Sequence, residues 1–137
     1  MQPFYFLEDE ATADVAFIAN GRSLQEAFTN ACNALTAVIT DSNLIDVTEH
    51  RQISLTAEDL PGLLYDLLDH LLFLFDTENL MFKLNQVILD PETITLQWTG
   101  QGEAYQESKH IIHTHVKAVT FFGMEITTSY VKVTLDL

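Results

Sequence analysis

The chain is poor in basic residues: six lysines and arginines stand against 20 aspartates and glutamates in 137 residues, which gives a formal net charge of −14 at pH 7. A surface of this sign repels the phosphate backbone of nucleic acids, so direct RNA or DNA binding is not expected. The same surface attracts divalent cations and basic proteins. Taken alone, the charge is equally consistent with a solvated acidic surface that has no specific meaning.

Cysteines, long apolar runs and a basic N-terminus are also missing. The single cysteine, Cys32, excludes an internal disulfide framework and is typical of a reducing cytosol. Its place on an apolar helix face favours a buried thiol over a reactive one. No apolar run is long enough to cross a bilayer. Residues 1–6 lack the basic start of a signal peptide, so we expect a cytoplasmic protein.

Hydrophobic residues make up 47% of the chain, and two stretches place them at helical spacing. The longer helix is predicted after Asp59, which can cap it, with Pro61 in the first turn where its missing N–H is no loss. The other is predicted after the capping box Ser23–Glu26 and ends near Thr40. The apolar face of the longer helix consists of Leu60, Leu63, Leu64, Leu67, Leu68, Leu71, Leu72 and Phe75. That of the other helix consists of Leu24, Ala27, Phe28, Ala31, Cys32, Leu35, Val38 and Ile39.

Alternating apolar and polar residues predict seven strands in the rest of the chain. A turn is expected at residues 20–22 and at 90–92, a polar loop at 100–109, and a bend at Gly123. The order is two strands, a helix, a strand, a helix and four strands, which indicates an α+β fold. We expect a single two-layer domain over residues 1–137, with a largely antiparallel sheet packed against two amphipathic helices. The strands are expected at residues 4–7, 14–20, 50–56, 82–89, 94–99, 114–121 and 130–137.

Catalytic signatures are absent from the sequence. It has no glycine-rich phosphate loop, no Gly-x-Ser-x-Gly elbow and no Cys-x-x-Cys pair. His110, His113 and His115 cluster, and the last two would share a strand face and could bind a transition metal. Without an evident third ligand, exposed histidines on a strand are the simpler interpretation.

Two acidic residues stand at strand ends. Asp14 opens one predicted strand, and Asp136 is the penultimate residue of another, one residue before the α-carboxylate of Leu137. Together they would form an all-oxygen site suited to calcium or magnesium. The alternative is a pair of ordinary solvated aspartates at strand ends.

Several segments, in this order and spacing, resemble the archease family over residues 4–137. The resemblance implies the α+β fold expected from the residues. It also implies that the chain is a protein cofactor of the GTP-dependent RNA ligase that joins a 3′-phosphate or 2′,3′-cyclic phosphate end to a 5′-hydroxyl in tRNA splicing and RNA repair. The matching segments are Thr12–Val15, Gly21 with Ser23–Phe28, Leu72–Glu78, His110, Val116–Thr120 and Val133–Leu137.

By this resemblance the protein is not an enzyme. Archeases promote guanylylation of the ligase's active-site histidine and bind a divalent ion, for which calcium is the first expectation and magnesium the second. The implied ligands are Asp14, Asp136 and Leu137, and Lys117 is the implied contact with the partner ligase. No membrane association is expected.

The chain departs from the family pattern at three places: Ala11 replaces a histidine, His115 replaces a glutamate, and Phe121-Phe122 replaces a Tyr-His pair. Asp9 or Glu10 could compensate for the lost polar groups. Two rival functions are a metal-dependent hydrolase, using the aspartates at the strand ends, and a general chaperone or binding module with a partly exposed apolar helix face.

Overall fold

The computed structural model describes residues 2–7 and 14–137, which form two α-helices, a short 3-10 helix and seven strands. The sequence-based order of helices and strands is confirmed. The elements are β1 (Phe4–Leu7), β2 (Asp14–Asn20), α1 (Leu24–Ile39), the 3-10 helix Ser42–Leu44, β3 (Glu49–Thr56), α2 (Leu60–Glu78), β4 (Leu80–Asp90), β5 (Thr95–Ala104), β6 (Ala118–Ile126) and β7 (Tyr130–Asp136).

The strands divide into two antiparallel sheets, where the sequence analysis expected one. The four-stranded sheet has the order β1-β2-β7-β6, and the three-stranded sheet has the order β3-β5-β4. Every neighbouring pair in both sheets is antiparallel. Alternation along a strand reveals that one face is buried but not which sheet the strand joins, so this division was not visible in the sequence.

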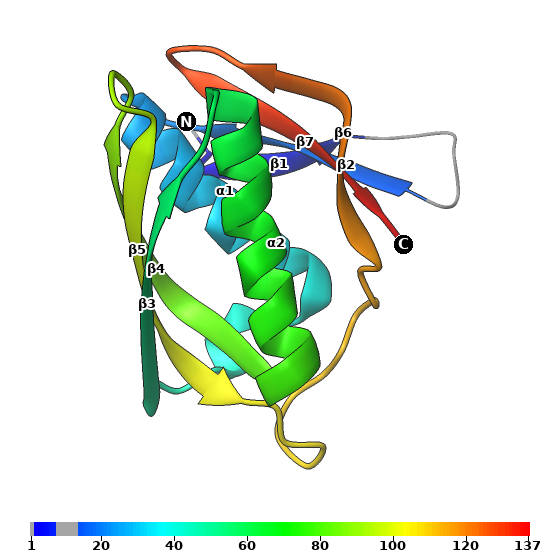
Figure 1. The fold of residues 1–137 in the computed structure, drawn as a ribbon. Coiled ribbons are helices and arrows are strands. Elements are labelled where there is room, and N and C mark those ends of the chain that lie inside the picture. The colour runs from blue at the N-terminus through cyan, green and yellow to red at the C-terminus, as the bar shows by residue number, and fades with distance from the viewer. Residues whose placement is uncertain (1, 8–13) are drawn as a thin grey trace.

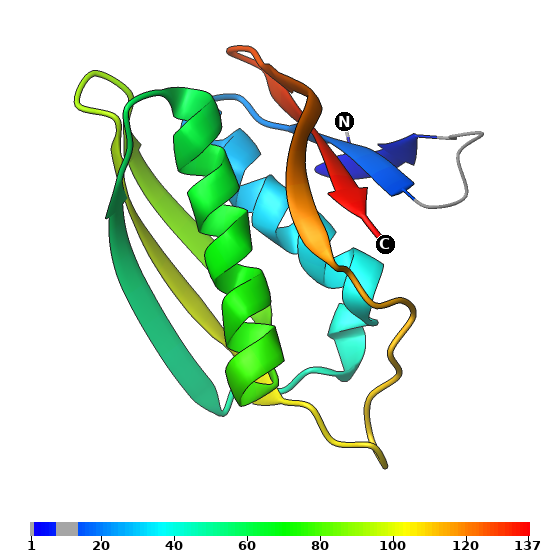
Figure 2. The ribbon, with the colours of Figure 1, turned by 45° about the vertical axis from the view of Figure 1, so that its right-hand side comes forward.

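The two helices lie between the sheets (Figures 1 and 2). Helix α1 packs against β4 on one side and against β2 and β7 on the other, while α2 packs against β6 and against the three-stranded sheet. Their apolar faces merge with the inner faces of both sheets into one core. The structure is a single α+β domain in which antiparallel strands pack on two amphipathic helices.

Both helix starts follow the predicted capping. The Ser23 hydroxyl accepts from the Glu26 amide at 3.1 Å, and the Asp59 carboxylate accepts from the Gly62 amide at 2.8 Å. The Glu26 carboxylate reaches back to the Arg22 amide at 3.4 Å rather than to that of Ser23. The leucines of the α2 apolar face between residues 63 and 72 are at most 5% exposed, which confirms that this face is core.

The bounds of β5 and β6 differ most from the sequence-based expectation, and other strand ends differ by one or two residues. Strand β5 continues to Ala104 through the region predicted as a loop, because it pairs with β3 and β4 on both sides. A Cβ at Gly102 would lie 1.8 Å from the Met81 carbonyl oxygen, so glycine is required for this close approach. Strand β6 runs from Ala118 to Ile126 rather than over residues 114–121. Gly123, predicted to bend the chain, lies inside this strand with φ +65°, within the shift of the register with β7.

Burial raises the pKa of the Cys32 thiol well above its ordinary range, so this side chain behaves as an inert part of the core. Among residues 2–7 and 14–137, no helix is long and apolar enough to cross a membrane.

Candidate functional site

Asp14 lies directly opposite Asp136 in the ladder that joins β2 to β7. Residues opposite each other in an antiparallel pair project to the same face, with Cα atoms about 4.5–5.5 Å apart. Both aspartates are half-buried, and so is Leu137, the next residue. The structure thus brings the first described residue of β2 and the end of β7 to one corner of the molecule (Figure 2).

The backbone at Asp136 is also hydrogen-bonded to the segment that leads into β6. The Lys117 amide donates to the Asp136 carbonyl at 2.8 Å, and Ala118 of β6 is the other register partner of Asp136. The Lys117 side chain is exposed. The starts of β2 and β6 therefore both meet the end of β7 at Asp136, and the aspartate has neighbours on both sides.

The two facing carboxylates carry the same charge. Like charges directly opposite in a sheet destabilise it. Within residues 2–7 and 14–137, no Lys, Arg or His forms an ion pair with either aspartate. A bound divalent cation would remove this repulsion, and carboxylate oxygens are the ligands that calcium and magnesium prefer.

The protein groups at this corner number fewer than a complete calcium site needs. Over the described residues there is no group of three or more His, Cys, Asp or Glu side chains that could hold a metal. Where the chain ends at Leu137, its α-carboxylate would join the two aspartates as a further donor. Asp9, Glu10 and Ala11 lie outside the described residues. A calcium ion takes six to eight oxygen ligands, so water or a partner's oxygens would complete this donor set.

The three histidines of the sequence cluster have different environments. His113 and His115 are exposed and precede β6, whereas His110 is buried. The alternative of exposed histidines fits His113 and His115, but neither lies on a strand.

The Phe121-Phe122 pair also departs from the family pattern. Phe121 stacks on Tyr65 of α2 with ring centroids 4.5 Å apart, and Phe122 is 78% exposed.

A buried polar cluster at the end of β5 was missed by the sequence analysis. The Glu103 carboxylate accepts from Lys109 Nζ at 2.9 Å and from the Asp46 amide at 3.1 Å, and it contacts His110 Nε2 at 2.8 Å. The donation from Lys109 is the main reason why the pKa of Glu103 falls to about 2. Glu103 is 4% exposed, so these donors replace the water that a carboxylate would otherwise need.

This cluster holds three segments of the fold together and offers no site for a substrate. Lys109 also bonds to Asp46 at 2.6 Å, so the cluster joins β5, the segment after the 3-10 helix and the loop that follows β5. Glu103 falls in a stretch that reads as a polar loop, and no pattern there indicated burial. The only sequence signal was His110, which belongs to the segments shared with the archease family.

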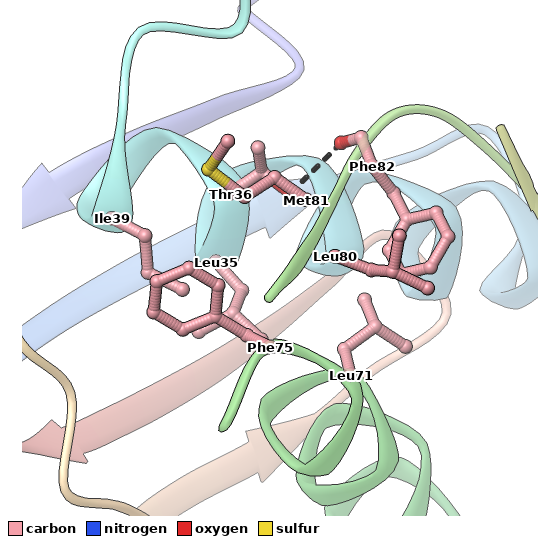
Figure 3. A pocket seen from close by; sticks show the side chains of 8 residues that line it. All are labelled: Leu35, Thr36, Ile39, Leu71, Phe75, Leu80, Met81 and Phe82. Atoms are coloured by element: carbon pink, nitrogen blue, oxygen red, sulfur yellow. Dashed lines mark hydrogen bonds between the residues drawn. The ribbon is translucent and has the colours of Figure 1, made fainter. Parts of the chain in front are cut away.

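A small cavity lies between α1, the end of α2 and the start of β4 (Figure 3). Its volume is about 20 Å³, which is room for about one water molecule. The one hydroxyl in its lining, that of Thr36, already donates to the Phe82 carbonyl at 3.0 Å. An apolar void without a free polar group is a packing defect of the core and no binding site. It is lined by Leu35, Thr36, Ile39, Leu71, Phe75, Leu80, Met81 and Phe82.

Comparison with known proteins is consistent with this architecture. Residues 4–137 match the archease protein family. Protein archease of Methanothermobacter thermautotrophicus is 43% identical over 128 residues, covering 92% of this chain and 89% of the relative. Protein archease of Sulfurisphaera tokodaii is 38% identical over 126 residues, with the same coverage.

A solved structure supports the fold. The solution structure of Methanobacterium thermoautotrophicum protein 1598 superposes with a TM-score of 0.77 at 36% identity, covering 100% of both chains. The family match, the identity with curated relatives and the shared fold agree along nearly the whole sequence, and the chain belongs to the archease protein family.

Proposed function

We propose that this protein is a non-catalytic activator of a 3′-phosphate/5′-hydroxyl RNA ligase, and that it acts through a divalent metal at the corner where β2 begins and β7 ends. The observation that carries the proposal is the placement of Asp14 opposite Asp136 beside Leu137, in a chain of the archease family. These are the positions that the family resemblance implies as ligands.

The donor set fits a hard cation. Asp14 and Asp136 supply carboxylate oxygens from one face of the sheet, and Leu137 supplies the terminal carboxylate where the chain ends there. When bound, calcium would provide a positive charge with coordination positions left for oxygens of the partner or its nucleotide. The chain's own part is to hold the carboxylates in place, and the bond from the Lys117 amide to the Asp136 carbonyl fixes the outer strand for that task.

The partner is expected to be a protein with a basic surface. A ligase that handles RNA and GTP must attract phosphates, and a chain of net charge −14 is steered toward such a surface. Lys117 is exposed one residue before β6 and next to the metal corner, where it can contact an acidic group of the ligase.

The rival functions have less support. A chaperone module would need an accessible apolar helix face, but that face of α2 is buried between the sheets. A hydrolase would need a nucleophile or general base beside the metal ligands, and the resemblance to archeases implies none.

The proposal is tested with the RNA ligase of the same organism. Guanylylation of the ligase is measured with and without this protein, in calcium and in magnesium, and calorimetric titration of each metal into the free protein runs beside it. We expect Asp14→Asn and Asp136→Asn to weaken both metal binding and activation. Asp66→Asn removes one negative charge from the exposed face of α2 and should leave both unchanged.

Three outcomes would argue against the proposal. Turnover of phosphoester substrates without any ligase would indicate a hydrolase. Equal activation by all variants would remove the metal corner from the mechanism. Equal metal affinity combined with lost activation would make this corner a docking surface instead of a metal site.

A further inference from the structure

The two edges of the three-stranded sheet differ in how their backbone groups are satisfied. The outer edge of β4 is closed by α1, whose side chains bond to its backbone: Thr36 to the Phe82 carbonyl at 3.0 Å, Thr29 to the Val87 amide at 3.2 Å and Gln25 to the Leu89 amide at 2.9 Å. The other edge is β3, which pairs with β5 alone. In Figure 2 it forms the outer border of the sheet.

The ladder determines which β3 groups point outward. The Ala57 amide bonds to the Ile94 carbonyl at 3.2 Å, and Ala57 continues the register of β3 with β5. In an antiparallel pair the bonded residues alternate, so odd-numbered residues bond to β5 and even-numbered residues direct their N–H and C=O groups outward. The outward set is His50, Gln52, Ser54 and Thr56. Among the described residues, one side chain bonds to it: Arg51 Nη1 donates to the His50 carbonyl at 2.8 Å.

Strand β3 lacks most of the features that protect edge strands from pairing. Such protection comes from proline, charged side chains and lysine above all, a bulge or a cover over the edge, and β3 has two charged residues, Glu49 and Arg51. The eight residues of β3 contain neither proline nor lysine, and their register with β5 has no shift. The strand therefore offers a straight, unpaired edge.

The charge of the residues in and around β3 bears on which kind of strand can pair with this edge. Strand β3 has one acidic and one basic residue, Glu49 and Arg51, in a chain whose net charge is −14, and Arg51 also pairs with Glu78 of α2 at 2.9 Å. The adjoining outer face of the sheet continues with the uncharged side chains of Gln97 and Thr99 on β5. Two copies of this acidic chain repel each other over most of their surface, and they repel less where β3, with its single acidic and single basic residue, meets β3.

We propose that β3 is a self-association edge, on which a second copy of the chain adds its own β3 antiparallel and joins the two three-stranded sheets into one. This inference is independent of the proposed ligase activation. The pairing follows a twofold axis, as most homodimers do. Its main-chain bonds would come from the outward groups of the even-numbered residues.

One register pairs the outward N–H and C=O groups of β3 with those of the second copy over nearly the whole strand. With residues 50–56 paired against residues 56–50 of the second copy, Ile53 faces Ile53 of the second copy at the axis. On the sheet face that bears Ile53, Arg51 lies opposite Leu55, and on the outer face Gln52 lies opposite Ser54. No like charges face each other, and the β-branched pair at the centre is of a kind that stabilises sheets. The interface is small, so the dimer is expected to be weak.

Sedimentation equilibrium and hydrogen exchange of the full chain test the proposal. We expect a monomer–dimer equilibrium that strengthens as salt rises from about 0.05 M to about 0.5 M, because salt screens the repulsion between the copies. As the dimer fraction rises, the amides of Gln52 and Ser54 should become protected. The amides of Ile53 and Leu55, bonded to β5, should be protected throughout.

Two proline variants remove one outward donor each. Ser54→Pro and Gln52→Pro should lower the association constant at least about tenfold, since an edge strand tolerates proline where its N–H faces away from the sheet. Ser54→Thr keeps the amide and is the matched control. A monomer at millimolar protein in both salts would overturn the proposal. So would a dimer that persists in both folded proline variants, or one whose formation leaves Gln52 and Ser54 unprotected. If neither proline variant folds, the exchange pattern of the unmodified chain decides.

Discussion

The Nε2 atom of His110 lies 2.8 Å from Oε1 of Glu103, and both side chains are buried. The Gln106 amide donates to Nδ1 of the same ring at 2.9 Å, so Nδ1 accepts and the proton of the neutral imidazole is on Nε2, where it faces the carboxylate. The ring is thereby held in one tautomer by two bonds. A histidine fully used in this way serves the fold and is not available as a metal ligand.

The cluster of Glu103, Lys109, His110 and Asp46 makes the free energy of unfolding depend on pH in the acid range. The pKa of Glu103 falls from 4.5 in the unfolded chain to about 2 in the folded protein, chiefly because Lys109 donates to the carboxylate. A lowered folded-state pKa contributes stability that is fully present above pH 4.5 and is lost as the pH falls toward 2. We expect Glu103→Gln to lower the free energy of unfolding at neutral pH, and this deficit relative to the unmodified chain should shrink over that window.

Urea unfolding followed by circular dichroism at a series of pH values measures this difference. Glu107→Gln is the control, because Glu107 is an exposed residue of the same loop. A deficit that stays constant down to pH 2 would show that the charge of Glu103 is not what stabilises the cluster.

Leu71→Asp should unfold the domain. Leu71 is 5% exposed on α2, and an unpaired buried carboxylate costs several kcal/mol, against a total stability of roughly 5–15 kcal/mol for a domain. Phe73→Asp, two residues along the same helix at a position that is 56% exposed, should remain folded. Thermal melts of both variants check the prediction, and a cooperative melt of Leu71→Asp near that of the unmodified chain would contradict it.

Extension of the chain beyond Leu137 should weaken metal binding while leaving the fold intact. An added residue converts the α-carboxylate to an amide, whose carbonyl can still coordinate calcium but carries no charge. Calcium titrations of a chain that ends at Leu137 and of one with a C-terminal tag should differ in affinity and agree in melting temperature. They should extend to millimolar calcium, the weak end of the range at roughly 10⁻⁴–10⁻³ M. An N-terminally tagged chain is the control, and equal affinity of all three would exclude the terminal carboxylate as a ligand.

The protein alone should not bind RNA at physiological salt. The net charge of −14 opposes association with phosphates. Nucleic-acid binding gains free energy when lysines and arginines displace the counterions of the phosphates, and this chain has only six such residues. Fluorescence anisotropy with labelled tRNA should show no saturable binding at micromolar protein. Submicromolar affinity that weakens steeply with salt would refute this and would indicate a local basic surface.

Local signals explain which parts of the fold could be predicted. Asp59 and Pro61 marked the start of α2, and Ser23 marked that of α1, because caps act within one turn of the chain. Strand β5 was predicted too short because Gly100 and Gly102 read as loop residues. Each is needed where a Cβ would collide with a neighbour, respectively the Trp98 ring and the Met81 backbone. Only pairing between distant strands reveals that requirement.

The candidate site was predictable in part. Asp14 and Asp136 were placed at strand ends from alternation, but their direct opposition depends on a register between segments that are more than a hundred residues apart. The Glu103 cluster could not be predicted, because the burial of a glutamate depends on donors that reach it from two separate segments, the one after the 3-10 helix and the loop after β5. Whether the carboxylates of Asp14 and Asp136 bind a metal stays a prediction.

The pairing of β2 with β7 also constrains how the chain assembles as it is synthesised. Residues 14–20 find their central partner only after residues 130–136 have left the ribosome, whereas β3, β4 and β5 with both helices are complete by residue 104. The three-stranded sheet can therefore form first, while the edge of β2 that pairs with β7, including Phe17 and Ala19, stays unpaired. Long-range pairing of this kind slows folding and exposes apolar strands to aggregation. A nascent chain that stalls before β7 would be a substrate for chaperones, even though most of its core residues are already present.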